Sequence, residues 1–283
     1  MQAENKTWQG ICEFPLANRT EKPRERGVTM IIDKGLGLRQ TRDLLEVAAA
    51  YVDYLKLSFG TSAFYTPEVL QQKLALVRTF GVDCYPGGTF LEVAYIQGRV
   101  QQFIDRVAEL GFTALEVSDG TVAMHRRDRT AAIRYACTLG LKVFTEVGKK
   151  HPADRVPKLR LKEDIMADLE AGAEKVIIEG RESGKGVVIF EPDGSINEDE
   201  LEFLVQAVPD VNLLIWEAPL KPQQEALIMR FGPNVNLGNI PPDEILALES
   251  LRRGLRGDTL RHALITNPAW RLRRDFSSDD AGR

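Results

Sequence analysis

Residues 175–180 read KVIIEG, a short apolar run that ends in an acid and a glycine. Similar runs recur along the chain and alternate with segments of helical apolar spacing. We expect strands at Val28–Asp33, Tyr54–Gly60, Asp83–Gly87, Ala114–Asp119, Lys142–Gly148, Lys175–Gly180, Leu213–Ala218 and Val235–Ile240. Strands that alternate with helices imply parallel strands and right-handed crossovers, and eight such units favour a closed barrel. The sequence therefore predicts an α/β fold, a single (β/α)8 TIM barrel.

The length and the helical pattern agree with one barrel. The chain has 283 residues, and such barrels take about 250. A helix should begin at Pro67, and others should lie near 126–139, 161–172, 198–208, 221–231 and 242–256. One further helix has a clear apolar stripe, formed by Val100, Phe103, Ile104, Val107 and Ala108. No GxGxxG sequence follows the first strand, which argues against a dinucleotide-binding sheet.

The barrel should occupy residues 27–260 as the catalytic domain. Residues 1–26 are expected to form an N-terminal extension, and residues 261–283 a C-terminal extension. The polar end, Ser277–Arg283, should make that C-terminal extension partly flexible.

Composition excludes several classes of protein. With 43% hydrophobic and 28% charged residues the chain is not disordered, and its net charge of -4 gives no basic field for nucleic acid. Cys12, Cys84 and Cys137 are sparse and lack metal-ligand spacing, as in a reducing compartment. The N-terminus lacks an apolar signal core, and no run is long enough to span a membrane. We expect a soluble cytoplasmic protein without nucleic-acid or membrane partners. The residues leave open whether it forms a homo-oligomer.

Acids lie at the carboxyl ends of the expected strands, where barrel enzymes place their active sites. They are Asp33, Glu116, Asp119, Glu146, Glu179 and Glu217. Each is embedded in an apolar run, and a buried carboxylate costs several kcal/mol unless it is paired or binds a metal. Oxygen ligands without histidine suit Mg²⁺ better than zinc. We predict a magnesium site among Asp33, Glu116, Glu146 and Glu179. The alternative for any one acid is an ion pair with a loop lysine or arginine.

The loop after the sixth strand, EGRESGKG at 179–186, has the composition of an anion site. Glycines allow close backbone approach, and arginine, serine and lysine donate hydrogen bonds to an anion. We predict that Arg181, Ser183, Gly184 and Lys185 bind a phosphate, although a flexible hairpin would also explain the glycines. Gly87 and Gly88 in YPGGT, which can equally form a simple turn, and Asn239 on the last strand are further candidates for substrate binding.

Three lysines could take part in catalysis. Lys149 and Lys150 directly follow the fifth strand, beside Glu146, and Lys56 lies within the second strand. A lysine can donate a proton when its pKa is lowered, whereas arginine cannot. Adjacent residues of an extended segment point opposite ways, so only one of the pair should face the substrate. A solvated loop is the alternative for this pair, and a fixed electrostatic role is expected for Lys56.

Together these motifs resemble the phosphosulfolactate synthase family. They are GTSA (60–63), YPGGT (85–89), SDG (118–120), TEVGKK (145–150), IIEGRESGKG (177–186), EAP (217–219), VNLGNI (235–240) and LRRGLRGDT (251–259). The resemblance covers about 28–260. It implies a (β/α)8 barrel and a carbon–sulfur lyase that adds sulfite to phosphoenolpyruvate with Mg²⁺, giving phosphosulfolactate for coenzyme M biosynthesis. It also favours Lys150 over Lys149 as the proton donor.

Two other functions stay open at this point. An aldolase-like barrel enzyme acting on a phosphorylated small acid could form a Schiff base through Lys56 or Lys149. The family also has plant relatives associated with heat tolerance, so a non-enzymatic stress protein on the same fold is the second alternative. That alternative predicts loss of the acids at the strand ends, and they are all present.

Overall fold

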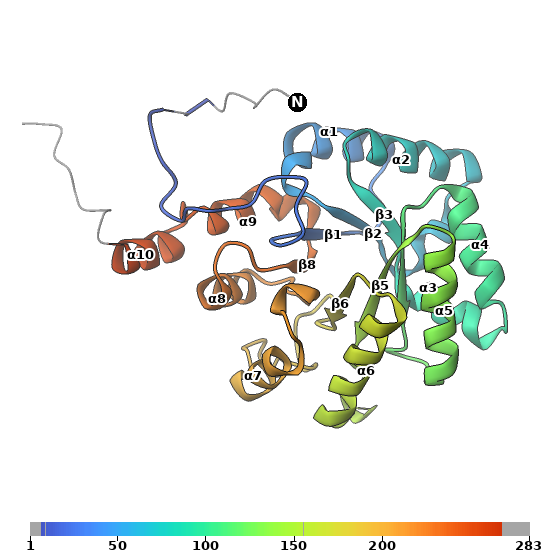
Figure 1. Cartoon of the computed structure of the whole chain (residues 1–283). Coiled ribbons are helices and arrows are strands. Elements are labelled where there is room, and N and C mark those ends of the chain that lie inside the picture. The colour runs from blue at the N-terminus through green and yellow to red at the C-terminus, as the bar shows by residue number, and fades with distance from the viewer. Residues whose placement is uncertain (1–6, 9, 155, 268–283) are drawn as a thin grey trace, which may run out of the picture.

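The computed structural model describes residues 7–8, 10–154 and 156–267. Its centre is one sheet of eight parallel strands in the order β3-β2-β1-β8-β7-β6-β5-β4 (Figure 1). The strands are β1 (Thr29–Asp33), β2 (Tyr54–Leu57), β3 (Asp83–Pro86), β4 (Ala114–Ser118), β5 (Lys142–Val147), β6 (Lys175–Ile178), β7 (Leu214–Glu217) and β8 (Leu237–Ile240). All eight lie within the ranges expected from the sequence.

The sheet curls into a nearly closed barrel whose seam lies between β3 and β4. These two strands end the ladder of paired strands. Thr113, just before β4, joins them: its N–H donates to the Cys84 carbonyl at 3.1 Å, and its hydroxyl accepts from the Cys84 N–H at 3.0 Å. The prediction of a single (β/α)8 barrel is confirmed.

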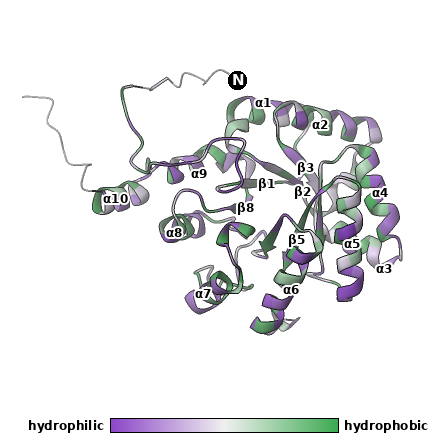
Figure 2. Cartoon of the chain, viewed as in Figure 1, coloured by the Kyte–Doolittle hydropathy of each residue, from purple (hydrophilic) through white to green (hydrophobic). Residues whose placement is uncertain are grey.

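Helices between the strands surround the sheet. They are α1 (Leu38–Ala48), α2 (Pro67–Thr79), α3 (Gly88–Ile96), α4 (Val100–Leu110), α5 (Arg126–Thr138), α6 (Lys158–Ala171), α7 (Glu198–Ala207), α8 (Lys221–Phe231), α9 (Ile245–Arg252) and α10 (Gly257–Thr266). Figure 2 shows that they carry both hydrophilic and hydrophobic positions, as helices on a core do. No helix of the described residues is long and apolar enough to cross a membrane.

Two helices differ from the expectation. The run Pro86-Gly87-Gly88 signals a turn, yet Gly88 begins α3, and Gly87 provides its extended N-cap. The single helix expected over 242–256 is a short 3-10 turn, η5 (Pro242–Glu244), followed by α9. Residues beyond α9 then form α10, which the apolar pattern did not indicate.

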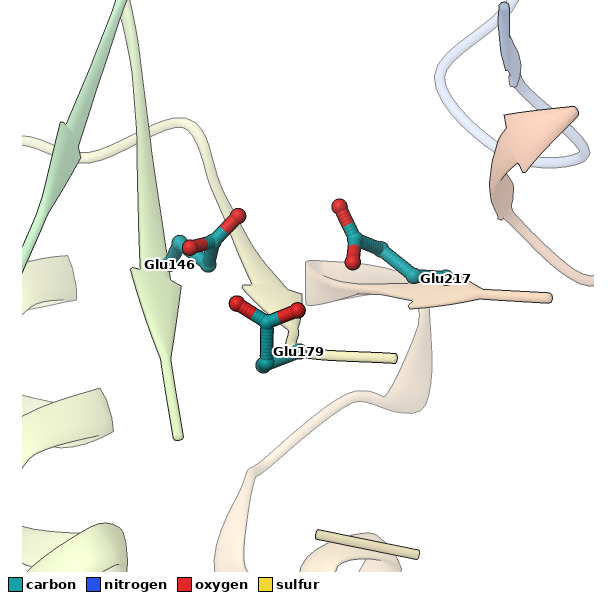
Figure 3. A group of neighbouring side chains, drawn as sticks. All are labelled: Glu146, Glu179 and Glu217. Atoms are coloured by element: carbon teal, nitrogen blue, oxygen red, sulfur yellow. The ribbon is translucent and has the colours of Figure 1, made fainter. Parts of the chain in front are cut away.

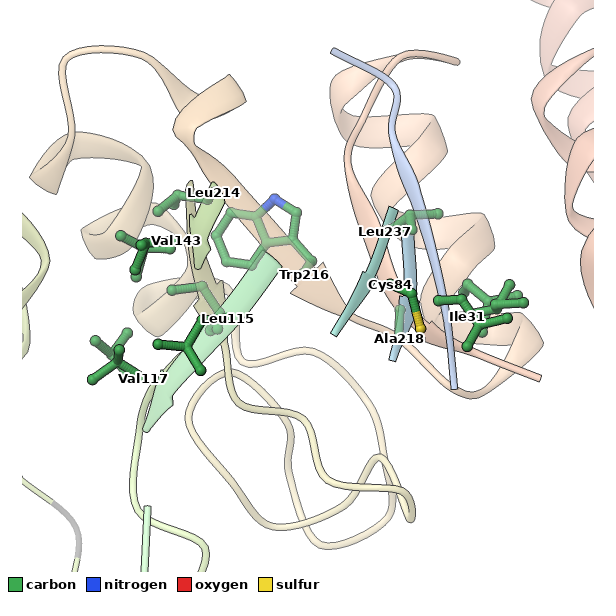
Figure 4. Close-up of a cluster of buried hydrophobic side chains, with 14 of the residues drawn as sticks. Ile31, Cys84, Leu115, Val117, Val143, Leu214, Trp216, Ala218 and Leu237 are labelled. Carbon is green, nitrogen blue, oxygen red and sulfur yellow. The ribbon is translucent and has the colours of Figure 1, made fainter. Parts of the chain in front are cut away.

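Strand alternation divides the buried side chains into two sets. One set faces the helices, and Figure 4 shows part of it, including Ile31, Leu115, Val143 and Trp216. The other set forms a separate cluster inside the barrel: Val28, Met30, Tyr54, Tyr85, Ala114, Phe144, Ile177 and Ile215. This inner cluster fills the barrel below the strand ends, so a cavity inside the barrel must lie above it, at the carboxyl ends of the strands.

Part of the predicted N-terminal extension is attached to the opposite end of the barrel. Arg19 pairs with Glu249 of α9 at 3.1 Å, and Arg24 pairs with Asp53, which precedes β2, at 2.9 Å. Lys22 donates to the Val52 carbonyl at 2.6 Å. These contacts lie at the amino ends of the strands, away from the expected site. The predicted flexible end, Ser277–Arg283, lies outside the described residues.

Candidate active site

A cavity of about 290 Å³ opens at the carboxyl ends of the strands. Its walls include these residues that the sequence singled out: Lys56, Gly87, Gly88, Glu116, Glu146, Lys150, Glu179, Arg181, Ser183 and Asn239. They also include Ile32, Ser58, Phe59, Thr89, Glu182 and Glu217. Four other predicted site residues, Asp33, Lys149, Gly184 and Lys185, are not part of the wall.

Three glutamates meet at one side of the cavity. Glu146 is on β5, Glu179 directly follows β6, and Glu217 ends β7. One carboxylate oxygen from each lies within 4.8 Å of the others, and the side chains face one another (Figure 3). All three are buried, and Oε2 of Glu179 has no hydrogen-bond partner among the described residues. We call Glu146, Glu179 and Glu217 the glutamate cluster.

Lys56 places one positive charge beside this cluster. Its ammonium lies 2.8 Å from Glu116 and 3.2 Å from both Glu146 and Glu217. Burial alone would lower the pKa of Lys56, but the three carboxylate charges outweigh it and raise the pKa well above its ordinary value. Lys56 is therefore held as an ammonium ion.

The carboxylates share too little positive charge. Burial, opposed by Lys56, raises the pKa of Glu116 to about 7. Burial and the charges of Glu146 and Glu217 raise the pKa of Glu179 well above its usual range. Glu146 has the opposite shift, because Lys150 and Lys56 outweigh its burial and lower its pKa. The upward shifts of Glu116 and Glu179 indicate that this group of buried carboxylates favours an additional positive charge.

The two neighbouring lysines after β5 point to different places. Lys150 lines the cavity, where its ammonium lies 2.9 Å from the Thr89 hydroxyl, 3.2 Å from Glu146 and 3.7 Å from Glu179. Lys149 instead donates to the carboxylate of Asp119 at 2.9 Å and to the Asp119 carbonyl. The backbone therefore presents only one member of the pair to a substrate.

Asp33 lies on the other side of the barrel wall. Its Oδ2 is 2.5 Å from the ammonium of Lys73 on α2. Its Oδ1 accepts the N–H groups of Gly35 and Leu36 at 2.8 Å each. These contacts bind the first strand to α2 and to the start of the following loop, and they keep Asp33 out of the glutamate cluster.

The loop after β6 turns only part of its predicted anion site toward the cavity. Arg181 and Ser183 line the wall. Gly184 is buried, and its carbonyl accepts from the side chain of Gln223 on α8 at 2.7 Å. Lys185 is exposed beyond the wall. At Gly180 an added Cβ would lie 2.4 Å from the Glu217 carbonyl, so this loop can leave β6 only with glycine there.

Three cavity residues that are not glycine have left-handed backbone conformations. Phe59, Arg181 and Asn239 have φ angles of 57°, 58° and 54°. Such conformations cost about 1–3 kcal/mol each and concentrate at functional sites. The Oδ1 atom of Asn239 is also buried without a hydrogen-bond partner in the described chain, which leaves an acceptor facing the cavity. The strain lies at the cavity wall, in the 3-10 helix η2 (Ser58–Phe64), in the loop after β6 and in β8.

Sequence reasoning missed several residues of this site. Glu217 was recognised at a strand end but not placed in the metal set, although it faces the inside of the barrel from β7 as Glu146 does from β5. Thr89 and Glu92 were not identified because they lie in α3, a helix that was not predicted from the sequence. Ser118, which ends β4, lies 3.0 Å from Glu146. Only the SDG motif marked its position.

Comparisons with known proteins agree on a family. The sequence model described as (2R)-phospho-3-sulfolactate synthase (ComA) matches residues 17–258. A phosphosulfolactate synthase of Methanothermobacter thermautotrophicus is 44% identical over 253 residues, which are 88% of this chain and 96% of the relative. One of Bacillus subtilis is 38% identical over 249 residues, covering 87% of this chain and 96% of that protein.

Solved structures with the same fold are distant in sequence. The 3-hexulose-6-phosphate synthase of Salmonella typhimurium superposes with a TM-score of 0.54 at 11% identity, covering 81% of this chain and all of that one, 100%. An aldolase of Escherichia coli gives a TM-score of 0.53 at 14% identity, covering 86% and 90% of the two chains. At such low identity these likenesses support the barrel fold alone.

Proposed function

The chain belongs to the phosphosulfolactate synthase family, and we propose that it catalyses the Mg²⁺-dependent addition of sulfite to phosphoenolpyruvate, giving phosphosulfolactate. The activity is that of a carbon–sulfur lyase. The observation that carries the proposal is the glutamate cluster beside Lys150 in one cavity, because it combines a cation site with a proton donor.

The glutamate cluster fits a magnesium ion. Its three ligand oxygens lie within 4.8 Å of one another, and carboxylate oxygens are the ligands that Mg²⁺ prefers. Oε2 of Glu179 makes no hydrogen bond among the described residues and lies 3.7 Å from the Lys150 ammonium, so it is an acceptor that a cation would satisfy. We propose Glu146, Glu179 and Glu217 as the ligands. Glu116 is not included, because its carboxylate pairs with Lys56 at 2.8 Å. When bound, Mg²⁺ supplies Lewis-acid stabilisation of the negative charge on the substrate carboxylate.

Positively charged and neutral donors at the cavity rim would hold the substrate anions. Arg181 and Ser183 face the cavity from the loop after β6 and are proposed to bind the phosphate. The sulfur of sulfite then forms a bond to the methylene carbon of phosphoenolpyruvate. The electron pair of the broken C=C π bond moves toward the neighbouring carbon, which bears the phosphate and the carboxylate, and that carbon needs a proton.

Lys150 is proposed to donate that proton. Burial alone would lower its pKa, but the charges of Glu146 and Glu179 outweigh burial and raise it, so the side chain enters the reaction as an ammonium ion. The Thr89 hydroxyl, 2.9 Å away, fixes its direction. The raised pKa differs from the lowered pKa expected from the sequence. Lys150 is charged at rest and held at the wall of the cavity, and a cation bound by Glu146 and Glu179 would offset the carboxylate charges that raise its pKa, which a general acid requires.

The aldolase-like alternative lacks a suitable nucleophile. Schiff-base formation needs a neutral amine, whereas three carboxylates keep Lys56 protonated. Lys149 is bound to Asp119 and is not in the cavity wall. For the non-enzymatic alternative, retention of the buried acids and lysines counts against a scaffold role, because burying such charges costs stability. We further propose a reducing cytoplasm as the location, since Cys12, Cys84 and Cys137 are all free.

The proposal is tested by consumption of phosphoenolpyruvate. Purified protein, stripped with EDTA, is incubated with phosphoenolpyruvate and sulfite before and after addition of Mg²⁺. We expect consumption that requires both sulfite and Mg²⁺, and no adduct when a keto acid and borohydride are supplied instead. Trapping of a keto acid on a lysine would favour the aldolase-like reaction.

A further inference from the structure

Glu92 of α3 is a buried acid whose contacts all lead to the loop after β4. Its side chain is 1% exposed. One carboxylate oxygen accepts the N–H of Thr121 at 2.8 Å and the N–H of Val122 at 2.6 Å. The other lies 3.1 Å from the Ser118 hydroxyl. Within residues 7–8, 10–154 and 156–267, no ion pair neutralises it, so its charge is held by these neutral donors alone.

Residues 118–122, which we call the β4 loop, connect Glu92 to the proposed cation ligand Glu146 and to the proposed proton donor Lys150. The Ser118 hydroxyl lies 3.0 Å from Oε1 of Glu146 as well as 3.1 Å from Glu92, so its single proton serves both carboxylates. The Gly120 N–H donates to the same hydroxyl at 3.2 Å. The Gly120 carbonyl accepts from the Lys150 N–H at 3.0 Å.

The side chain of Lys150 rests directly on Gly120. A Cβ added to Gly120 would lie 3.1 Å from Cε, 3.2 Å from Cγ and 3.3 Å from Cδ of Lys150. Such distances are shorter than ordinary van der Waals contact. The stem of the lysine therefore lies along a surface that exists only because residue 120 has no side chain, and the position of the β4 loop sets the position of the ammonium.

We propose that Glu92 is a positioning residue that fixes the β4 loop and thereby places the Lys150 ammonium and the Glu146 carboxylate. This inference rests on the proposed function for its catalytic consequence. A buried carboxylate without an ion-pair partner costs several kcal/mol of stability, so a role in packing alone does not explain Glu92 at this position. In return, charge-assisted hydrogen bonds from two successive N–H groups hold a loop more firmly than neutral ones would.

The test compares two substitutions at Glu92. Glu92→Gln keeps an oxygen that can accept both N–H groups, while its NH₂ group can donate to Ser118 and leave the serine proton to Glu146. Glu92→Ala removes every one of these contacts. Gly120→Ala is a third variant that displaces the Lys150 stem and leaves Glu92 unchanged. Glu249, buried at the opposite end of the barrel with Arg19, provides the control pair Glu249→Gln and Glu249→Ala.

Each variant is assayed at a temperature where circular dichroism shows it folded. Misplacing a reacting group by about 1 Å can cost on the order of a hundredfold, so Glu92→Ala should lower kcat about ten- to a hundredfold with KM for phosphoenolpyruvate nearly unchanged. Gly120→Ala should also lower kcat, and Glu92→Gln should restore most of it. The Glu249 variants should lose stability without loss of kcat. Unchanged kcat in folded Glu92→Ala overturns the proposal, and if that variant is recovered unfolded, unchanged kcat in Gly120→Ala does so.

Hydrogen exchange separates this inference from the proposed function. Without any substrate, Glu92→Ala should exchange faster than the wild type in peptides covering 119–122 and also in those covering 148–150. Faster exchange confined to 119–122 would show that the β4 loop does not hold Lys150, and the inference would fall. A wild-type protein that does not consume phosphoenolpyruvate with sulfite would refute the proposed function, and the exchange result would still decide the positioning of Lys150.

Discussion

The ammonium of Lys73 lies 2.5 Å from the carboxylate of Asp33, and both side chains are buried outside the barrel interior. Alternation along β1 explains this pair. Met30 belongs to the inner cluster and Ile32 lines the cavity, so Ile31 and Asp33 face the helices. Side chains alternate along a strand, so an acid at a strand end enters the cavity only when it falls on an inward-facing position. Asp33 falls on an outward-facing position.

Asp33→Asn should therefore affect stability and leave the cation site intact. It removes the charge that pairs with Lys73, and breaking a buried ion pair costs about 3–5 kcal/mol. We expect a lower midpoint in urea unfolding, with Mg²⁺ affinity by calorimetry changed less than about twofold, as for independent sites. A large loss of Mg²⁺ affinity in the folded variant would return Asp33 to the metal site.

Glu179→Gln and Glu217→Gln should each weaken Mg²⁺ binding. Each change replaces a charged ligand of the glutamate cluster by a neutral amide of similar shape. A loss of at least about tenfold in affinity, or 1.4 kcal/mol, is expected in calorimetric titrations. Glu146→Gln should behave alike, and Asp33→Asn is the matched control. Equal affinities in the wild type and all three glutamine variants would place the ion elsewhere.

Lys150→Ala should remove the general acid. We expect kcat to fall on the order of 10²–10⁴, the usual range for such groups, with a modest change in KM. Lys149→Ala is the matched neighbour, and it should keep kcat close to the wild-type value because Lys149 is bound to Asp119 outside the cavity. The reverse pattern would exchange their assignments, and full activity in both would exclude protonation by lysine.

Arg181→Ala should mainly weaken substrate binding. If Arg181 binds the phosphate equally in the ground and transition states, KM for phosphoenolpyruvate rises while kcat changes little. Lys185→Ala, on the same loop but outside the cavity wall, should have a much smaller effect on KM. Steady-state kinetics of the two variants tests this prediction. Wild-type KM values in both variants would show that this loop does not bind the phosphate.

The fold and the strand ends could be predicted because they depend on local pattern. Apolar runs such as KVIIEG have a length and flanking residues that define buried strands, and eight of them specify the barrel. Lys56, Glu146 and Glu179 were predicted from their positions on the strands and Arg181 from the composition of its loop, and all four line the cavity. Counting the alternation of side chains along each strand would have excluded Asp33 from the predicted metal site and included Glu217, because Glu217 lies on the same side of β7 as Ile215 of the inner cluster.

The features of the site that could not be predicted depend on contacts between segments that are distant in the sequence. Pro86-Gly87-Gly88 predicts a turn by local preference, but the close approach of Ser118 and Glu116 requires glycine at 88, and the helix begins there. Without α3, the roles of Thr89 and Glu92 have no sequence signal. The separation of Lys149 from Lys150 likewise depends on Asp119 and Gly120, which belong to another strand's loop.

The most direct test of the central claim follows the methylene carbon of phosphoenolpyruvate. The protein is incubated with phosphoenolpyruvate labelled with ¹³C at that carbon, together with sulfite and Mg²⁺, and the mixture is observed by ¹³C and ³¹P nuclear magnetic resonance. We predict that the vinylic carbon signal is replaced by that of a methylene bonded to sulfur while the phosphate ester is retained. Release of inorganic phosphate with labelled pyruvate, or an unchanged vinylic signal, would contradict the account.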